Sequence, residues 1–65
     1  MSMKQRKFQH TGDYTARPVV GQWYQLPDQS ITQCLAVGET MYHFDACSLP
    51  RAEFDFIRIE RVTPQ

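Results

Sequence analysis

Residues 30–44 of the chain read SITQCLAVGETMYHF, and this stretch decides the fold. Gly38-Glu39 lies between two segments, residues 30–37 and 40–44, whose composition suits the two strands of a β-hairpin. Glycine in the first position of a two-residue loop favours a type II′ turn, because that position requires a positive φ. We therefore predict strands over residues 30–37 and 40–44 that are joined by a tight turn.

Counting outward from this turn gives the register of the predicted hairpin. Leu35 should lie opposite Tyr42, and Cys34 should lie opposite His43. Because side chains alternate between the two faces of a strand, the large apolar residues gather on one face. This predicted core face comprises Ile31, Leu35, Val37, Tyr42 and Phe44, and the opposite face comprises Cys34, Ala36, Met41 and His43.

A further strand is expected on the N-terminal side of the hairpin. Residues 20–26 lie between Pro18 and Pro27. As a strand, they place Val20, Tyr24 and Leu26 on one face and Trp23 and Gln25 on the other. Prolines are suitable ends for a strand because they fix φ and lack an N–H group. The alternation places Trp23 on the face opposite the predicted core.

The C-terminal part is expected to contribute a helical turn and a last strand. Proline is tolerated in the first turn of a helix, so a single helical turn is predicted near Pro50, over residues 50–53. Residues 54–62 form the last predicted strand, which either contains a β-bulge near residues 56–57 or begins only at Phe56.

This succession of elements defines the predicted fold class. We expect an all-β domain of four or five strands, built as a small curled antiparallel sheet or as an SH3-like barrel. Short strands with a late helical turn before the last one resemble the small SH3-like barrels. The residues predicted to be mostly buried are Tyr24, Leu26, Leu35, Val37, Phe44 and Ile59.

The charges divide the chain into two unequal parts. Four basic residues and one acidic residue give residues 1–17 a net charge of +3, whereas three basic and six acidic residues give residues 18–65 a net charge of −3. We interpret residues 1–17 as a basic N-terminal arm, in which a short strand around Phe8 is an option, and residues 18–65 as a small β domain. Residues 1–12 are expected to serve binding rather than folding.

Length and composition restrict the class of protein. A chain of 65 residues has room for one domain, and it lacks the run of about 20 apolar residues that a membrane-spanning helix needs. The two cysteines are too few for a disulfide scaffold, and no apolar run follows the basic first residues as in a secretory signal. We expect a cytoplasmic protein with two reduced thiols and no membrane association.

Two groups of potentially reactive residues occur in the sequence, but each lacks a feature that its chemistry requires. Cys34, His43 and Asp45 have the residue types of an activated thiol nucleophile, but so short a chain shows neither a pocket nor an oxyanion site. Zinc ligands are available at His10, Cys34, His43 and Cys47, but the usual close cysteine pair is absent. The prediction is a protein that is not an enzyme and that carries no metal and no cofactor.

The remaining predictions concern binding. The preferred function is a non-catalytic interaction module, a small accessory or regulatory protein that binds a protein partner through aromatic residues such as Trp23 and Tyr14. The alternative is nucleic-acid binding, in which Lys4, Arg6 and Lys7 contact phosphates while Phe8 and Trp23 stack on bases. The identity of the partner and the oligomeric state stay open.

Overall fold

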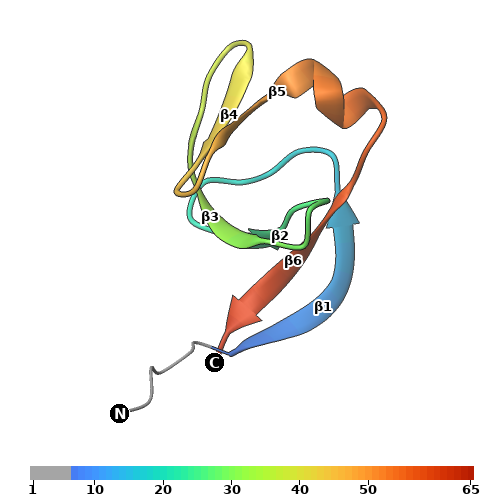
Figure 1. Ribbon diagram of the computed structural model, residues 1–65, viewed down its shortest axis with the longest axis vertical. Helices are drawn as coiled ribbons and strands as arrows, with labels where there is room; N and C mark the ends of the chain where they lie inside the picture. The colour runs from blue at the N-terminus through green and yellow to red at the C-terminus, as the bar shows by residue number, and fades with distance from the viewer. Residues whose placement is uncertain (1–6) are drawn as a thin grey trace.

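The computed structural model describes residues 7–65, which form one curled antiparallel sheet and a single 3₁₀ turn (Figure 1). The elements are β1 (Phe8–Thr15), β2 (Trp23–Gln25), β3 (Ile31–Val37), β4 (Met41–Phe44), β5 (Ser48–Pro50), η1 (Arg51–Asp55) and β6 (Ile59–Pro64). The strand order is β1-β6-β2-β3-β4-β5, so that β1 and β5 are the two edges. The all-β class, the curled sheet and the helical turn near Pro50 are confirmed, with six strands instead of four or five.

The segment predicted as an arm enters the sheet at Phe8. Strand β1 pairs antiparallel with β6, with Phe8 opposite Pro64 and His10 opposite Val62. The pairing supplies partners to backbone groups of a segment whose side chains show no apolar alternation. Residues 8–15 therefore belong to the sheet, and the short strand that the sequence allowed around Phe8 is present.

The hairpin forms, but its turn is displaced by one residue. The Gly38 N–H donates a hydrogen bond to the Met41 carbonyl oxygen at 2.8 Å, and Val37 lies opposite Tyr42. The turn is thus centred on Glu39-Thr40. Gly38 is not among the described residues with positive φ, so the predicted type II′ turn is wrong.

A bulge in β3 changes which of its side chains face the core. The displaced turn pairs Ala36 with His43, and a register shift between Cys34 and Ala36 then places Cys34 opposite Phe44, whereas the sequence predicted His43. Cys34 is consequently buried, whereas Leu35 is 50% exposed. Val37, at the end of β3, is 43% exposed. The predicted burial of Leu35 is wrong because the bulge places Cys34, and not Leu35, on the face of Phe44. The predicted burial of Val37 is also wrong: Val37 lies opposite the buried Tyr42, but it ends the strand and is left exposed there.

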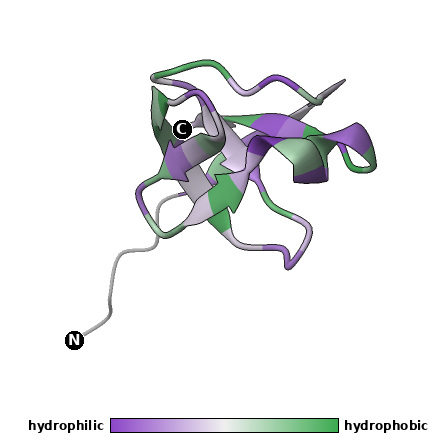
Figure 2. Ribbon diagram, turned by 90° about the horizontal axis from the view of Figure 1, so that it is seen from above, coloured by the Kyte–Doolittle hydropathy of each residue, from purple (hydrophilic) through white to green (hydrophobic). Residues whose placement is uncertain are grey.

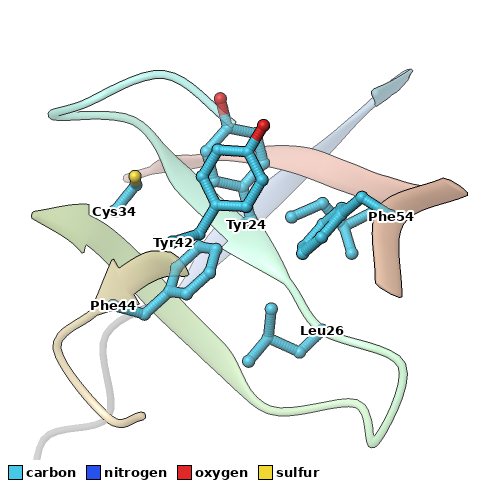
Figure 3. Packing of buried hydrophobic residues seen from close by; sticks show 7 residues of the cluster. Tyr24, Leu26, Cys34, Tyr42, Phe44 and Phe54 are labelled. Carbon is cyan, nitrogen blue, oxygen red and sulfur yellow. The ribbon is translucent and has the colours of Figure 1, made fainter. Parts of the chain in front are cut away.

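The core fills the concave side of the sheet. Tyr24, Leu26, Phe44 and Ile59 are buried as predicted. The side chains point toward one another from several strands (Figure 3), and the full cluster comprises Tyr24, Leu26, Cys34, Tyr42, Phe44, Phe54 and Ile59. Aromatic rings meet edge to face, an arrangement that adds to the stabilisation from burial.

The 3₁₀ turn occupies the beginning of the segment that was predicted as the last strand. Phe54 lies in η1 and is buried against Tyr42, with 4.9 Å between the ring centroids. Phe56 follows η1 and is exposed, and β6 begins only at Ile59. Phe54 and Phe56 thus lie in and directly after a helical turn, where the sequence predicted a strand with a bulge near residues 56–57 or a strand from Phe56.

Polar and apolar residues are interspersed along the whole described ribbon (Figure 2). In residues 7–65, no helix is long and apolar enough to cross a membrane.

Candidate functional site

The convex side of the β1–β6–β2 region carries most of the residues predicted to bind. Because Ile59 faces the core, Glu60 and Val62 of β6 face the opposite side. Cross-strand partners share a face, and the register pairs Phe8 with Pro64, Tyr14 with Glu60, and Trp23 with Val62. Phe8, Tyr14 and Trp23 therefore lie on one surface, which we call the outer aromatic face.

At one end of this face, Phe8 packs against Trp23. The ring centroids are 5.2 Å apart and the rings are tilted by 43°. Both side chains are partly exposed, and Val62, the strand partner of Trp23, is buried. The contact joins the edge strand β1 to β2 across β6, so these aromatic rings hold β1 in place while exposing part of their surface.

At the other end lies a shallow groove of about 420 Å³, which we call the Tyr14 groove. Tyr14 is 63% exposed, and Pro27 and Ile57 also line the groove. Gln25 and Gln29 add amide groups to the lining. Apolar walls with a few polar groups are typical of ligand-binding sites.

A hydrogen-bonded pair, His10 and Glu60, connects the two ends of this face: Glu60 lines the Tyr14 groove, and His10 lies opposite Val62, as Trp23 does. Glu60 accepts a hydrogen bond from the Gly12 N–H at 2.9 Å, and its other oxygen lies 2.8 Å from Nδ1 of His10. These interactions lower the pKa of Glu60, with the Gly12 N–H as the larger cause. The geometry depends on the irregular segment between His10 and Tyr14, where Gly12 adopts a φ of 78°.

The lowered pKa predicts an acid-sensitive contribution to stability. A carboxyl group with a folded-state pKa below its ordinary value of 4.5 stabilises the fold above that pH, and this contribution is lost as the pH falls through the folded-state pKa. We expect Glu60→Gln to lower the urea midpoint at pH 7 and to reduce the loss of stability between pH 7 and pH 3. An unchanged loss over that interval would show that other carboxyl groups account for it.

The basic residues of the predicted site are only partly described. Lys7 is exposed, and its carbonyl oxygen accepts a hydrogen bond from the Gln65 N–H at 2.9 Å. Lys4 and Arg6 lie outside the described residues. Sequence reasoning missed Glu60 and the groove residue Ile57, because their places depend on the register of β1 with β6. An isolated glycine in a strand, here Gly12, was the available signal for an irregularity at that point.

The structure separates the side chains of the hypothetical thiol site. Cys34 is buried in the core, whereas His43 is exposed and its Nδ1 lies 2.9 Å from the Ser48 hydroxyl. The cross-strand neighbours assumed for a nucleophile are thus on opposite faces. Burial also raises the pKa of the Cys34 thiol, which disfavours the reactive thiolate.

The two cysteines should differ in their reaction with a thiol reagent. Cys47 is exposed and Cys34 is buried, and both are free. We expect one rapid equivalent in the native protein, and two in denaturant after anaerobic purification. A Cys47→Ser variant should abolish the rapid phase, whereas two rapid native equivalents would contradict the burial of Cys34.

Within the part of the chain that the structure covers, no three His, Cys, Asp or Glu side chains gather into a group able to hold a metal ion. No protein-family model matches the chain, and no curated protein and no solved structure is significantly similar to it.

Proposed function

We propose that this chain is a non-catalytic interaction module that binds a protein partner through the outer aromatic face. The observation that carries the proposal is the register of β1, β6 and β2, which gathers Phe8, Tyr14 and Trp23 on one surface. Tyrosine and tryptophan supply much of the binding energy at protein interfaces, since they bury a large area with few rotatable bonds. A binding surface of this size suits a small accessory or regulatory protein.

The distribution of polar groups on the face supports a peptide or protein surface as the ligand. Two partly apolar patches lie at the two ends of the face, and the His10–Glu60 pair, which is fixed by hydrogen bonds, connects them. A partner with apolar side chains spaced to reach both patches, and a hydrogen-bond donor between them, would complement this pattern. The carboxylate of Glu60 disfavours a phosphate backbone along the same path.

The edges of the sheet favour docking by side chains over the addition of a strand. The irregular segment around Gly12 interrupts β1, and Pro50 lies in β5, the other edge. Bulges and prolines on edge strands discourage pairing with a further chain. We therefore infer that the partner contacts the convex face and does not extend the sheet.

The charge of the described residues also favours a protein partner. Residues 7–65 contain five basic and seven acidic residues, which give a net charge of −2. Nucleic-acid-binding domains usually carry a basic surface. The nucleic-acid alternative depends on Lys4 and Arg6 together with Lys7, and it becomes one outcome of the test below. We also propose that the protein is cytoplasmic. Both cysteines are unpaired, and unpaired cysteines are typical of proteins in reducing compartments.

The test compares capture by the immobilised protein and by two variants. Tyr14→Ser removes an exposed aromatic ring from the face, and Phe56→Ser removes one that lies outside the sheet, after η1. We expect a protein from nuclease-treated lysate of the source cells to bind the wild type and Phe56→Ser, and to be lost with Tyr14→Ser. Loss on nuclease treatment would favour the nucleic-acid alternative, and equal capture by all three would reject the outer aromatic face.

A further inference from the structure

A second site lies away from the Phe8–Trp23 pair, where the segment after β1 approaches η1. A cleft of about 670 Å³ is lined there by Arg17, Arg51 and Arg58, and we call it the arginine cleft. Asp55 is the one carboxylate among the described residues that line it. The buried rings of Tyr42 and Phe54 belong to its wall, so the charged groups surround a partly apolar base.

The charge of the cleft is opposite to that of its surroundings. Three of the four described arginines line it, and with Asp55 they give a local charge of +2. The described chain as a whole carries −2. Charges of one sign gathered in a concave site concentrate the field there and attract ligands of the opposite sign. The charge of the cleft therefore favours the approach of an anion.

Arg51 is held in place within the cleft. One terminal nitrogen of its guanidinium donates a hydrogen bond to the Gly38 carbonyl oxygen at 2.8 Å. The guanidinium carbon lies 5.4 Å from the centre of the Tyr42 ring, within the range of a cation–π contact. A guanidinium has five N–H donors, so most of them remain for a ligand after this contact.

Arg17 and Arg58 have donors that the protein does not use. In residues 7–65, neither side chain has a hydrogen-bond or ion-pair partner, in contrast to Arg61, which pairs with Asp13 at 3.2 Å. Both residues are exposed. Since they need not break an existing interaction, they can turn toward an anion at little cost beyond the ordering of the side chain.

We propose that the arginine cleft binds a phosphomonoester. A phosphate dianion matches the local charge of +2, and the planar guanidinium forms paired hydrogen bonds with phosphate oxygens. The volume of about 670 Å³ exceeds what phosphate alone needs and lies within the range of small-molecule sites, so an organic group accompanies the phosphate. Asp55 accepts hydrogen bonds from hydroxyl groups of that part of the ligand. This inference does not rest on the proposed function.

The experiment is a titration of the full chain, observed by amide chemical shifts in two-dimensional NMR. The probes are ribose 5-phosphate, inorganic phosphate and ribose. We expect saturable shifts at Ala52 and Asp55 with ribose 5-phosphate, weaker binding of inorganic phosphate, and none of ribose. Arg17→Gln and Arg58→Gln should each weaken binding about tenfold or more, the effect of losing a hydrogen bond to a charged group.

A matched variant separates this site from the rest of the surface. Arg61→Gln removes the same charge from a side chain that does not line the cleft, and it should bind ribose 5-phosphate as the wild type does. The absence of saturable binding at millimolar concentration would overturn the proposal, as would equal binding by the Arg17→Gln and Arg58→Gln variants. Tighter binding of a single-stranded oligonucleotide that needs the same arginines would also overturn it, in favour of a phosphodiester ligand.

Discussion

Replacement of Phe44 by alanine is expected to unfold most of the protein at 25 °C. Phe44 is 5% exposed and packs against Tyr24, with 6.4 Å between the ring centroids and the rings nearly perpendicular. Deleting a buried phenylalanine costs about 3–5 kcal/mol, because the apolar contacts are lost and a cavity remains. A single core of this size supplies on the order of 3–5 kcal/mol in total. The cost of the substitution therefore equals the available stability.

The matched control for this substitution is Phe56→Ala. Phe56 is 89% exposed, so the same change of side chain removes almost no buried area. We expect a free energy of unfolding within about 0.5 kcal/mol of the wild type, as for most surface substitutions. Thermal unfolding followed by near-ultraviolet circular dichroism measures both variants. A cooperative transition of Phe44→Ala near that of the wild type would contradict the core described above.

Deletion of residues 1–12 is expected to have the second large effect. It removes the part of β1 that pairs through Phe8 and His10, together with the Phe8–Trp23 contact. It also removes the Gly12 N–H that binds Glu60 and the Thr11 hydroxyl, which donates to the Arg61 carbonyl oxygen at 2.6 Å. Val62 then becomes less covered on the convex side, and residues 62–64 of β6 lose their partners in β1.

Two deletions separate this effect from that of the first residues. The deletion of residues 1–6 leaves all of β1 in place, so we expect it to keep a cooperative thermal transition. The deletion of residues 1–12 should lower the melting temperature by roughly 8–16 °C, the shift that a loss of about 2 kcal/mol causes in a domain of this size. This expectation replaces the interpretation of residues 1–12 as a segment that serves binding alone. Equal melting of both deletions and the wild type would restore that interpretation.

Local alternation predicted the parts of the fold that local interactions determine. Tyr24 and Leu26 alternate with Trp23, and this was enough to place the first two in the core and Trp23 on the opposite face. The bulge in β3 could not be read in the same way. It accompanies backbone hydrogen bonds from Cys34 to Gln22 at 3.0 Å and from Gly21 to Cys34 at 2.8 Å, which are long-range interactions.

The candidate site could be predicted even less from local sequence patterns. Residues 8–15 carry no apolar alternation, and they form a strand because β6 supplies an edge for pairing. The gathering of Phe8, Tyr14 and Trp23 therefore depends on a register between residues about 50 positions apart. The arginine cleft likewise joins Arg17 to Arg51 and Arg58, which no local pattern connects.

The position of β6 has a consequence for the order in which the sheet is completed. In the described chain β6 follows every other strand, yet it lies between β1 and β2 and is the strand partner of both (Figure 1). During synthesis on the ribosome, β2–β5 can pair with one another as a meander before β6 is available. Strand β1 has no strand partner until β6 has left the ribosome. Contacts between distant segments are slow to form because a long loop must close first. The docking of β1 onto β6 is therefore expected to be the late step of folding, and the outer aromatic face comes into existence only when that step is complete.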